Sequence, residues 1–279
     1  SRDWSSDVCS SDLESDLIDV WFDSGAMPYA QWGLKNMDKW AENFPADFIA
    51  EGVDQTRGWF FTLHAIAVML FDSVAYKNVV ANGLVLDKNG NKMSKRLGNA
   101  IDPFTTIATY GADATRWYMM TNSDPWDNLK FDIEGIGETQ RKFFGTLYNT
   151  YSFFAIYANI DQYEFDSERS IQVSELSELD RWILSKLNTL IERVSKSMDD
   201  YDPTPAARAI ETFVCDDLSN WYVRLSRRRF WKGEMNSDKQ AAYDTLHTCL
   251  TTVAQLASPY APFFSDWLYG SLKPKMQGS

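Results

Sequence analysis

The hydrophobic pattern of the chain changes near Pro125, and this change most strongly limits the folds available to it. Before Pro125, short apolar runs alternate with helical stretches, whereas after it long segments place apolar residues every three or four positions. Short apolar runs bounded by turns are typical of strands, and a 3.6-residue period is typical of amphipathic helices. The sequence therefore predicts an α/β part followed by an all-α helical bundle.

The first part has the element order of a βαβ unit. The predicted elements are, in order, a short buried strand at 47–50, a helix at 56–71, strands at 78–80 and 84–86, and helices at 103–110 and 112–120. A turn is expected at Asp87–Gly90, and Gly111 is expected to cap a helix. Strand, helix and strand with short links favour a parallel sheet. The run Gly58–Phe71 is shorter than the roughly 20 residues that span a bilayer, so it predicts a buried core helix and no membrane segment.

Three apolar stripes define the helical part. The first contains Leu179, Trp182, Ile183, Leu187, Leu190, Ile191 and Val194, the second Ile210, Phe213, Val214, Leu218, Trp221, Tyr222 and Leu225, and the third Tyr243, Leu246, Leu250, Val253 and Ala257. Pro203 and Pro205 predict a helix start, and Pro259 and Pro262 predict a break before a last short helix. Stripes with this spacing predict helices that bury one face against each other.

Charge and cysteine content exclude some classes of protein. Asp and Glu number 39 against 27 Lys and Arg, so the net charge of −12 gives no overall basic surface for nucleic acid. Cys9, Cys215 and Cys249 are scattered, which argues against a disulfide framework and a bound zinc ion and favours a reducing, cytoplasmic compartment. No lysine-led hydrophobic segment opens the chain, so no secretory signal is expected.

The first 13 residues differ from the rest. They are polar and acidic, with the similar halves Trp4–Asp7 and Cys9–Asp12, and show neither helical nor strand periodicity. The segment resembles translated sequencing-adapter sequence, and the alternative is a disordered acidic tail. We expect a non-native tail that takes no part in the fold.

Two segments carry groups suited to a nucleotide. Lys92-Met93-Ser94-Lys95-Arg96 follows a glycine turn and predicts a mobile cationic arm for a polyphosphate, with a solvated basic loop as the alternative. Glu51, Asp54 and Gln55 lie where a strand ends and a helix begins, which is where ligands bind in open α/β sheets. Their carboxylates and amide suit ribose hydroxyls and an ammonium group, and the alternative is simple helix capping by Asp54.

A third segment, Asp19-Val20-Trp21-Phe22-Asp23-Ser24-Gly25, places two aromatic residues between acids. Trp21 and Trp59 are candidates for the walls of an apolar pocket, and the alternative is that they are core residues.

Together, residues 19–25, 51–60 (Glu-Gly-Val-Asp-Gln-Thr-Arg-Gly-Trp-Phe) and 92–96 closely resemble the class I isoleucyl-tRNA synthetases. Residues 179–184 and 216–222 resemble the helical anticodon-binding domain of that family, and the resemblance covers Leu17–Leu272. Each motif is shared with the valyl and leucyl enzymes, but the tryptophan-containing forms favour isoleucine.

The resemblance implies ATP-dependent activation of isoleucine to isoleucyl-adenylate, followed by transfer to tRNA, with ATP and Mg²⁺ as substrate. The implied domains are a non-native tail (1–13), the C-terminal part of a Rossmann-type catalytic domain (14–127) and a helical anticodon-binding domain (128–279). The implied sites are catalytic Lys95 supported by Lys92, an ATP-binding loop of Lys92, Met93, Ser94 and Lys95, adenylate-binding Glu51, Gly52, Asp54 and Gln55, and a side-chain pocket of Trp21 and Trp59.

The chain also departs from the family pattern. The His-x-Gly-His signature that grips ATP and the editing insertion are both absent, so we expect a fragment that is inactive without those segments. Asn82 and Arg96 stand where many relatives carry histidine and serine. His64 and His247 are expected to be structural. A valyl-type synthetase and a non-catalytic RNA-binding module are the alternative functions.

Local positive charge is found near the end of the second stripe. Five basic residues and no acid lie between Trp221 and Lys232. On a helix, Arg224, Arg227 and Arg228 project away from the apolar stripe, which predicts a cationic face for tRNA phosphates. The alternative is a solvated helix end whose cations interact with the helix dipole.

Overall fold

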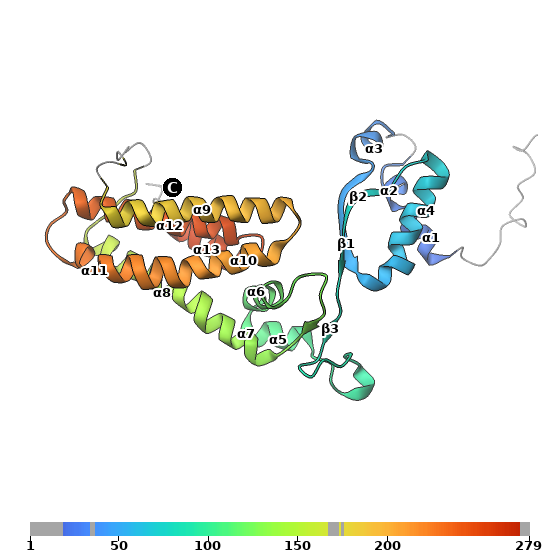
Figure 1. Cartoon of the computed structure of the whole chain (residues 1–279), viewed down its shortest axis with the longest axis horizontal. Helices are drawn as coiled ribbons and strands as arrows, with labels where there is room; N and C mark the ends of the chain where they lie inside the picture. Colours follow the sequence, from blue (N-terminus) through green and yellow to red (C-terminus); the bar gives the residue numbers. More distant parts are fainter. Residues whose placement is uncertain (1–18, 34–36, 167–172, 174–175, 274–279) are drawn as a thin grey trace, which may run out of the picture. The chain divides into compact units, whose positions relative to one another are not determined.

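The structure is a computed structural model that describes residues 19–33, 37–166, 173 and 176–273 (Figure 1). The predicted tail at 1–13 lies outside the described residues. The chain forms two compact units, which divide between Leu84 and Val85. The boundaries predicted from the sequence, at 13/14 and 127/128, follow a family resemblance rather than packing and stay a prediction.

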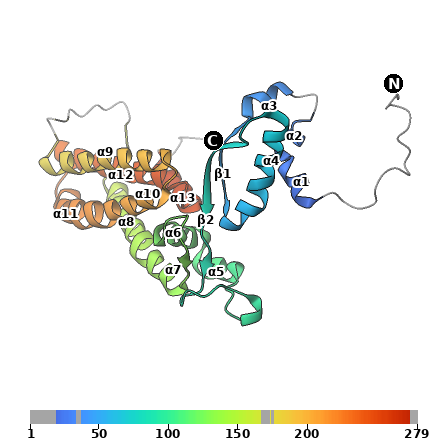
Figure 2. The ribbon, with the colours of Figure 1, turned by 45° about the vertical axis from the view of Figure 1, so that its right-hand side comes forward.

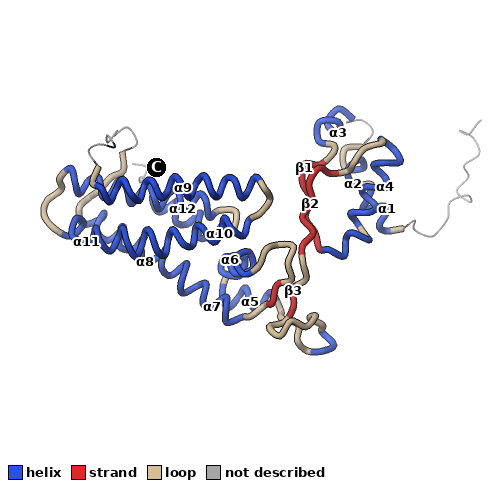
Figure 3. The backbone as a smooth tube through the Cα atoms, viewed as in Figure 1, coloured by secondary structure: helices blue, strands red, loops and turns tan. Residues whose placement is uncertain are grey.

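The first unit is built on two parallel strands, drawn in red in Figure 3. Its elements are α1 (Val20–Gly25), α2 (Met27–Ala30), α3 (Met37–Asn43), β1 (Ala46–Gly52), the 3-10 helix η3 (Val53–Arg57), α4 (Trp59–Phe71) and β2 (Tyr76–Asn82). β1 pairs with β2 in parallel, in a register that runs from Ala46 opposite Tyr76 to Gly52 opposite Asn82. Because α4 connects the two strands, the predicted βαβ unit is confirmed.

The burial predicted for this unit is wrong in two places. In β1, Ile49 packs against the small core formed by Leu63, Ala67 and Ala75, but Phe48 on the opposite face is exposed. The helix α4 buries one face only, and Met69 is 73% exposed. The described sheet has two strands, so a single helix covers only one side of it.

The helix after β1 also begins later than predicted. Residues 53–57 form a 3-10 turn, and Gly58 has backbone angles of φ −135° and ψ −115°, which are not helical. α4 therefore starts at Trp59 rather than Thr56.

The second unit begins with a short α/β segment and continues into helices. Its elements are β3 (Val85–Leu86), η4 (Lys95–Leu97), α5 (Pro103–Tyr110), α6 (Ala112–Asn122), β4 (Leu129–Lys130), α7 (Ile133–Thr139), the π-helix η5 (Gln140–Phe144), α8 (Gly145–Ile160), α9 (Glu178–Asp199), α10 (Pro203–Thr212), the π-helix η7 (Phe213–Val223), α11 (Arg224–Trp231), α12 (Ser237–Ala257) and α13 (Pro262–Leu272). β3 pairs with β4 in parallel, Val85 opposite Leu129. The predicted α/β part followed by helices is confirmed.

Local signals set several helix ends. Asp102 caps α5 through hydrogen bonds from the N–H groups of Phe104 and Thr105, and α5 ends at Gly111, whose φ is +83°. α10 and α13 begin at Pro203 and Pro262, as predicted.

Helices α9, α10 and α12 pack against one another in the bundle (Figure 1 and Figure 2). Its core continues into the residues before position 128, since Trp117 of α6 stacks on Phe143 of η5 with ring centroids 4.0 Å apart. The first and third stripes face this core, but in the second stripe Trp221 and Leu225 are 58% and 56% exposed. That part of the prediction is wrong because η7 is π-helical, so each turn holds more than 3.6 residues and a stripe drawn at 3.6 drifts off the core.

Candidate functional site

The loop after β1 brings the predicted adenylate-binding residues together. Glu51 and Asp54 are exposed. The Asp54 carboxylate lies against Gly52, where an added Cβ atom would be 2.5 Å from Oδ1 of Asp54. Gln55 donates a hydrogen bond from Nε2 to Oδ2 of Asp54 at 3.4 Å, and its Oε1 accepts one from the N–H of Trp59 at 3.0 Å. Gln55 rather than Asp54 therefore accepts the hydrogen bond from the first N–H group of α4, and the Glu51 and Asp54 side chains remain exposed.

Helix α1 packs against the start of α4 and brings the two predicted pocket tryptophans near each other. Trp59 donates from Nε1 to the carbonyl oxygen of Ser24 at 3.0 Å. The ring of Trp21, which is 45% exposed, lies 3.7 Å from where a Cβ atom on Gly58 would stand. Gly25 is buried, and an added Cβ would lie 2.9 Å from Cβ of Thr62, so the close approach of α1 and α4 requires glycine there.

The histidines have different environments. His64 is exposed in the first unit and lines a hollow of about 290 Å³ together with Phe60, Phe61 and Tyr76. His247 is buried in the second unit, where its Nε2 lies 3.0 Å from the carbonyl oxygen of Leu272. Burial lowers the pKa of His247, so the neutral ring serves as a packing group.

The lysine loop belongs to the second unit. Leu86 of β3 forms an antiparallel bridge with Lys92, and the turn between them closes with a hydrogen bond from the N–H of Gly90 to the backbone oxygen of Asp87 at 2.9 Å.

The residues of the predicted ATP-binding loop have different environments. Lys92 is exposed, and Met93 packs against the bundle core. Oγ of Ser94 accepts a hydrogen bond from the N–H of Arg96 at 3.2 Å. Lys95 begins η4, and its side chain lies outside the part of the chain that is described.

Asp87 and Asn99 hold this loop, a role that was not predicted for either residue although Asp87 starts the expected turn. Asp87 accepts hydrogen bonds from Asn89, Asn91 and Asn99, and these bonds lower the pKa of the Asp87 carboxyl; the backbone N–H of Asn91 has the largest effect. Asn99 follows Lys92 by seven positions, and nothing in the local sequence indicates that the two meet.

The basic residues near the end of the second stripe separate into two groups. Arg224, Arg227 and Arg228 are exposed, and so are Trp221 and Leu225 of the stripe from which they were expected to point away, so a cationic face for tRNA stays a prediction. Arg229 is turned inward, where its guanidinium donates two hydrogen bonds of 2.7 Å to the fully buried Asp180 and two more to the Asp238 carboxylate.

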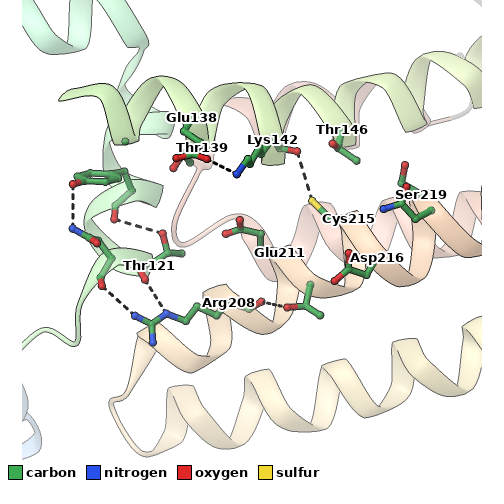
Figure 4. Close-up of a pocket in the computed structure, with 15 residues that line it drawn as sticks. Thr121, Glu138, Thr139, Lys142, Thr146, Arg208, Glu211, Cys215, Asp216 and Ser219 are labelled. Carbon is green, nitrogen blue, oxygen red and sulfur yellow. Dashed lines mark hydrogen bonds and ion pairs between the residues drawn. The ribbon is translucent and has the colours of Figure 1, made fainter. Parts of the chain in front are cut away.

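A polar groove in the second unit was not predicted. It has a volume of about 830 Å³, and its walls come from α6, α7, α8, α10 and the π-helices η5 and η7 (Figure 4). Arg208 donates to the carbonyl oxygens of Thr121 and Asn122 at 2.8 and 3.2 Å, and Lys142 pairs with Glu138. Burial raises the pKa of the Cys215 thiol to about 11, so this groove cysteine is protonated near neutral pH. The residues are distant in the sequence, and no motif joins them.

Among the described residues no group of three or more His, Cys, Asp or Glu side chains could hold a metal ion. Within the same residues, no helix combines the length and apolar character that crossing a membrane requires.

Two family models match the chain. One, described as tRNA synthetases class I (I, L, M and V), matches residues 8–132, and the other, an anticodon-binding domain of tRNA ligase, matches residues 180–278.

Curated relatives agree with these matches. The chain is 67% identical over 261 residues to the isoleucine–tRNA ligase of Cytophaga hutchinsonii, covering 93% of the chain and 23% of that relative. It is 67% identical over 263 residues to the isoleucine–tRNA ligase of Bacteroides thetaiotaomicron, covering 93% and 22%. It is 49% identical to the isoleucine–tRNA ligase of Thermus thermophilus, covering 92% and 24%. The chain thus spans about a quarter of the length of the curated relatives it matches.

Solved structures share the fold. The Agrobacterium radiobacter K84 LeuRS–tRNA–LeuAMS ternary complex matches with a TM-score of 0.72 at 19% identity, covering 94% of this chain and 32% of that one. The Mycobacterium tuberculosis methionyl-tRNA synthetase in complex with methionyl-adenylate matches with a TM-score of 0.73 at 20% identity, covering 89% and 48%.

Proposed function

The chain belongs to the class I tRNA synthetases of the isoleucine, leucine, methionine and valine group, and from this premise we propose that it serves the ATP-dependent attachment of isoleucine to its tRNA as part of a longer enzyme. The observation that carries the proposal is the 67% identity to isoleucine–tRNA ligases over 93% of the chain. The reaction passes through isoleucyl-adenylate and releases pyrophosphate from ATP, which enters with Mg²⁺.

Adenylate binding is assigned to the loop after β1. Glu51 and Asp54 present exposed carboxylates that can accept hydrogen bonds from ribose hydroxyls or pair with the ammonium group of isoleucine. Gly52, assigned to the same site, leaves room for the Asp54 carboxylate beside the backbone, and Gln55 orients Asp54 through its amide. Trp21 and Trp59 supply apolar surface for the sec-butyl group, which dispersion and desolvation alone can recognise.

Phosphate binding is assigned to the loop of the second unit. Lys92 and Lys95 are cations on a short segment whose backbone is hydrogen-bonded to the side chain of Asn99. Lys95 would stabilise the negative charge that develops on the departing pyrophosphate, and Lys92 would support it. The sequence predicts a mobile arm here, and the hydrogen bonds between Asn99 and the backbone of Lys92 and Ser94 limit how far the base of that arm can move.

The tRNA contact is assigned to α11, where Arg224, Arg227 and Arg228 are exposed. Arginine binds phosphate with two parallel hydrogen bonds, so three of them suit an RNA backbone even on a chain whose net charge is −12. We place the enzyme in the cytoplasm, where fractionation of cells should recover it.

Amino-acid-dependent exchange of pyrophosphate into ATP tests the catalytic part of the proposal. The longer enzyme that contains this chain should exchange with isoleucine, and the 279-residue chain alone should not. Lys95→Ala should lower kcat about a hundredfold. Lys88→Ala, an exposed lysine of the preceding turn, is the matched control and should leave kcat unchanged. Stronger exchange with valine would establish a valyl-type enzyme, and no exchange with any amino acid would favour a non-catalytic RNA-binding module.

The salt dependence of tRNA binding tests the RNA contact. In the same enzyme, replacing Arg224, Arg227 and Arg228 by Ala should weaken binding and reduce the slope of log affinity against log salt by about 3, one unit for each phosphate that is no longer neutralised. Arg193→Ala, at an exposed arginine of α9, should change neither quantity. An unchanged slope in the triple variant would remove α11 from the interface.

A further inference from the structure

A single carboxylate organises the loop that carries the two lysines. Oδ1 of Asp87 accepts hydrogen bonds from the backbone N–H groups of Asn89 and Asn91, at 2.9 and 2.8 Å. Its Oδ2 accepts from the side-chain amides of Asn91 at 3.3 Å and Asn99 at 3.0 Å. Asp87 thus connects the turn before the lysines to a residue that follows them.

Asn99 completes the connection by bonding to the backbone of the lysine segment. Its Nδ2 donates to the carbonyl oxygen of Lys92 at 3.2 Å as well as to Asp87. Its Oδ1 accepts from the backbone N–H of Ser94 at 2.9 Å. These two backbone contacts flank Met93, which packs against the bundle core. One amide therefore fixes the backbone on both sides of the residue that anchors the loop.

We propose that Asp87 and Asn99 are positioning residues that hold the Lys92–Lys95 backbone in place for the ATP phosphates. The proposal rests on the function assigned to these lysines above. A lysine side chain is long and flexible, so the backbone beneath it decides how closely its ammonium group follows a phosphate. Neither Asp87 nor Asn99 is assigned a contact with ATP. Their loss should therefore lower kcat for adenylate formation and leave the KM for isoleucine nearly unchanged.

Limited proteolysis of the 279-residue chain with trypsin tests whether Asp87 and Asn99 hold the lysine segment; we call these two residues the clamp. Cleavage after Lys92, Lys95 and Arg96 should be about tenfold faster in Asn99→Ala, since this variant lacks three hydrogen bonds that hold the segment. Cleavage after Lys232, an exposed lysine elsewhere in the second unit, provides the internal reference. Asn91→Ala is the matched control: Asn91 also donates to Oδ2 of Asp87 but leaves the Lys92 and Ser94 contacts intact.

Pyrophosphate exchange by the longer enzyme gives the second readout. Asn99→Ala should lower kcat about tenfold with an unchanged KM for isoleucine, and Asn91→Ala should behave like the unmodified enzyme. Asn99→Asp places two carboxylates against each other, whereas the exchanged pair Asp87→Asn with Asn99→Asp restores a donor facing an acceptor. The exchanged pair should therefore recover part of the kcat that Asn99→Asp loses.

Equal cleavage rates in Asn99→Ala and Asn91→Ala would overturn the proposal, as would a loss in Asn99→Asp that the exchanged pair does not relieve. If Asn99→Ala also speeds cleavage after Lys232, the milder variant Asp87→Asn, which retains Oδ1, replaces it. Its cleavage rates after Lys92, Lys95 and Arg96 are then compared with those of Asn91→Ala, and equal rates would overturn the proposal. Proteolysis reports on the clamp even if the enzyme exchanges no pyrophosphate, so a failure of the proposed function is distinguishable from a failure of the clamp.

Discussion

Arg228 and Arg229 are neighbours in one basic run, yet their environments are opposite. Arg228 is exposed, whereas the Arg229 side chain is 16% exposed and pairs with Asp180, whose side chain is fully buried. Tyr222 and Ser177 donate two further hydrogen bonds to the same carboxylate. Asp180 therefore joins the start of α9 to η7 and α11, and the Arg229 guanidinium is occupied by this structural role.

Removing Arg229 should therefore destabilise the fold rather than weaken RNA binding alone. Arg229→Ala leaves the Asp180 charge buried and unpaired, which we expect to lower the free energy of unfolding by about 3–5 kcal/mol. Arg228→Ala should change it by no more than about 0.5 kcal/mol. Urea unfolding followed by circular dichroism measures both, and equal effects of the two substitutions would contradict the assigned roles.

The same network predicts how stability depends on pH. Burial raises the pKa of Asp180, but hydrogen bonds from Arg229, Tyr222 and Ser177 outweigh it, and the net pKa lies below the ordinary 3.8. The stabilisation is thus fully present above the unfolded-state pKa and is lost as pH falls through the lower folded-state pKa. Unfolding midpoints between pH 6 and 2 should fall less steeply in Asp180→Asn than in the unmodified chain. Parallel pH profiles would exclude Asp180 as a source of acid sensitivity.

At the scale of elements, most helices and strands follow from local signals. The βαβ order, the proline-led starts of α10 and α13 and the glycine end of α5 were all predictable, because each depends on residues near one another in the sequence. The π-helix η7 was not, and it turns Trp221 and Leu225 out of a stripe that a regular α-helix would bury.

Two leucines test this interpretation of η7. Leu218 is fully buried and Leu225 is 56% exposed, although a 3.6-residue period places both on one face. Leu218→Ala should lower the free energy of unfolding by about 2–5 kcal/mol. Leu225→Ala should change it by at most about 0.5 kcal/mol. Thermal and urea unfolding measure the difference, and comparable losses would mean that the regular stripe is correct.

At the scale of the whole molecule, the two units differ in how well they bury apolar surface. The second unit has a large core that includes Trp117, Tyr222 and Leu246, all with no exposed surface. The first unit has a small core, and Phe61 and Leu70 of α4 are 64% and 63% exposed. The described sheet there has two strands, so each strand has an open edge. Exposed large apolar side chains and open strand edges favour association.

We therefore expect the 279-residue chain to self-associate through its first unit. Light scattering and gel filtration should show oligomers for the whole chain, and a piece from Val85 onward should be monodisperse and melt cooperatively. The longer enzyme should cover the same surface and behave as a single species. A monodisperse, cooperatively melting 279-residue chain would contradict this expectation.

The sequence by itself determined the kinds of elements, their order and the motifs that identify the family, because periodicity, caps and short signatures depend on residues close together in the chain. The tertiary structure alone decided which arginine is buried, which stripe residues reach the core, and that Asn99 meets Asp87 and Lys92. The groove beside Arg208 and Lys142 likewise exists only in the folded chain. These features depend on which segments come into contact in the folded chain, and no motif or periodicity in the sequence specifies those contacts.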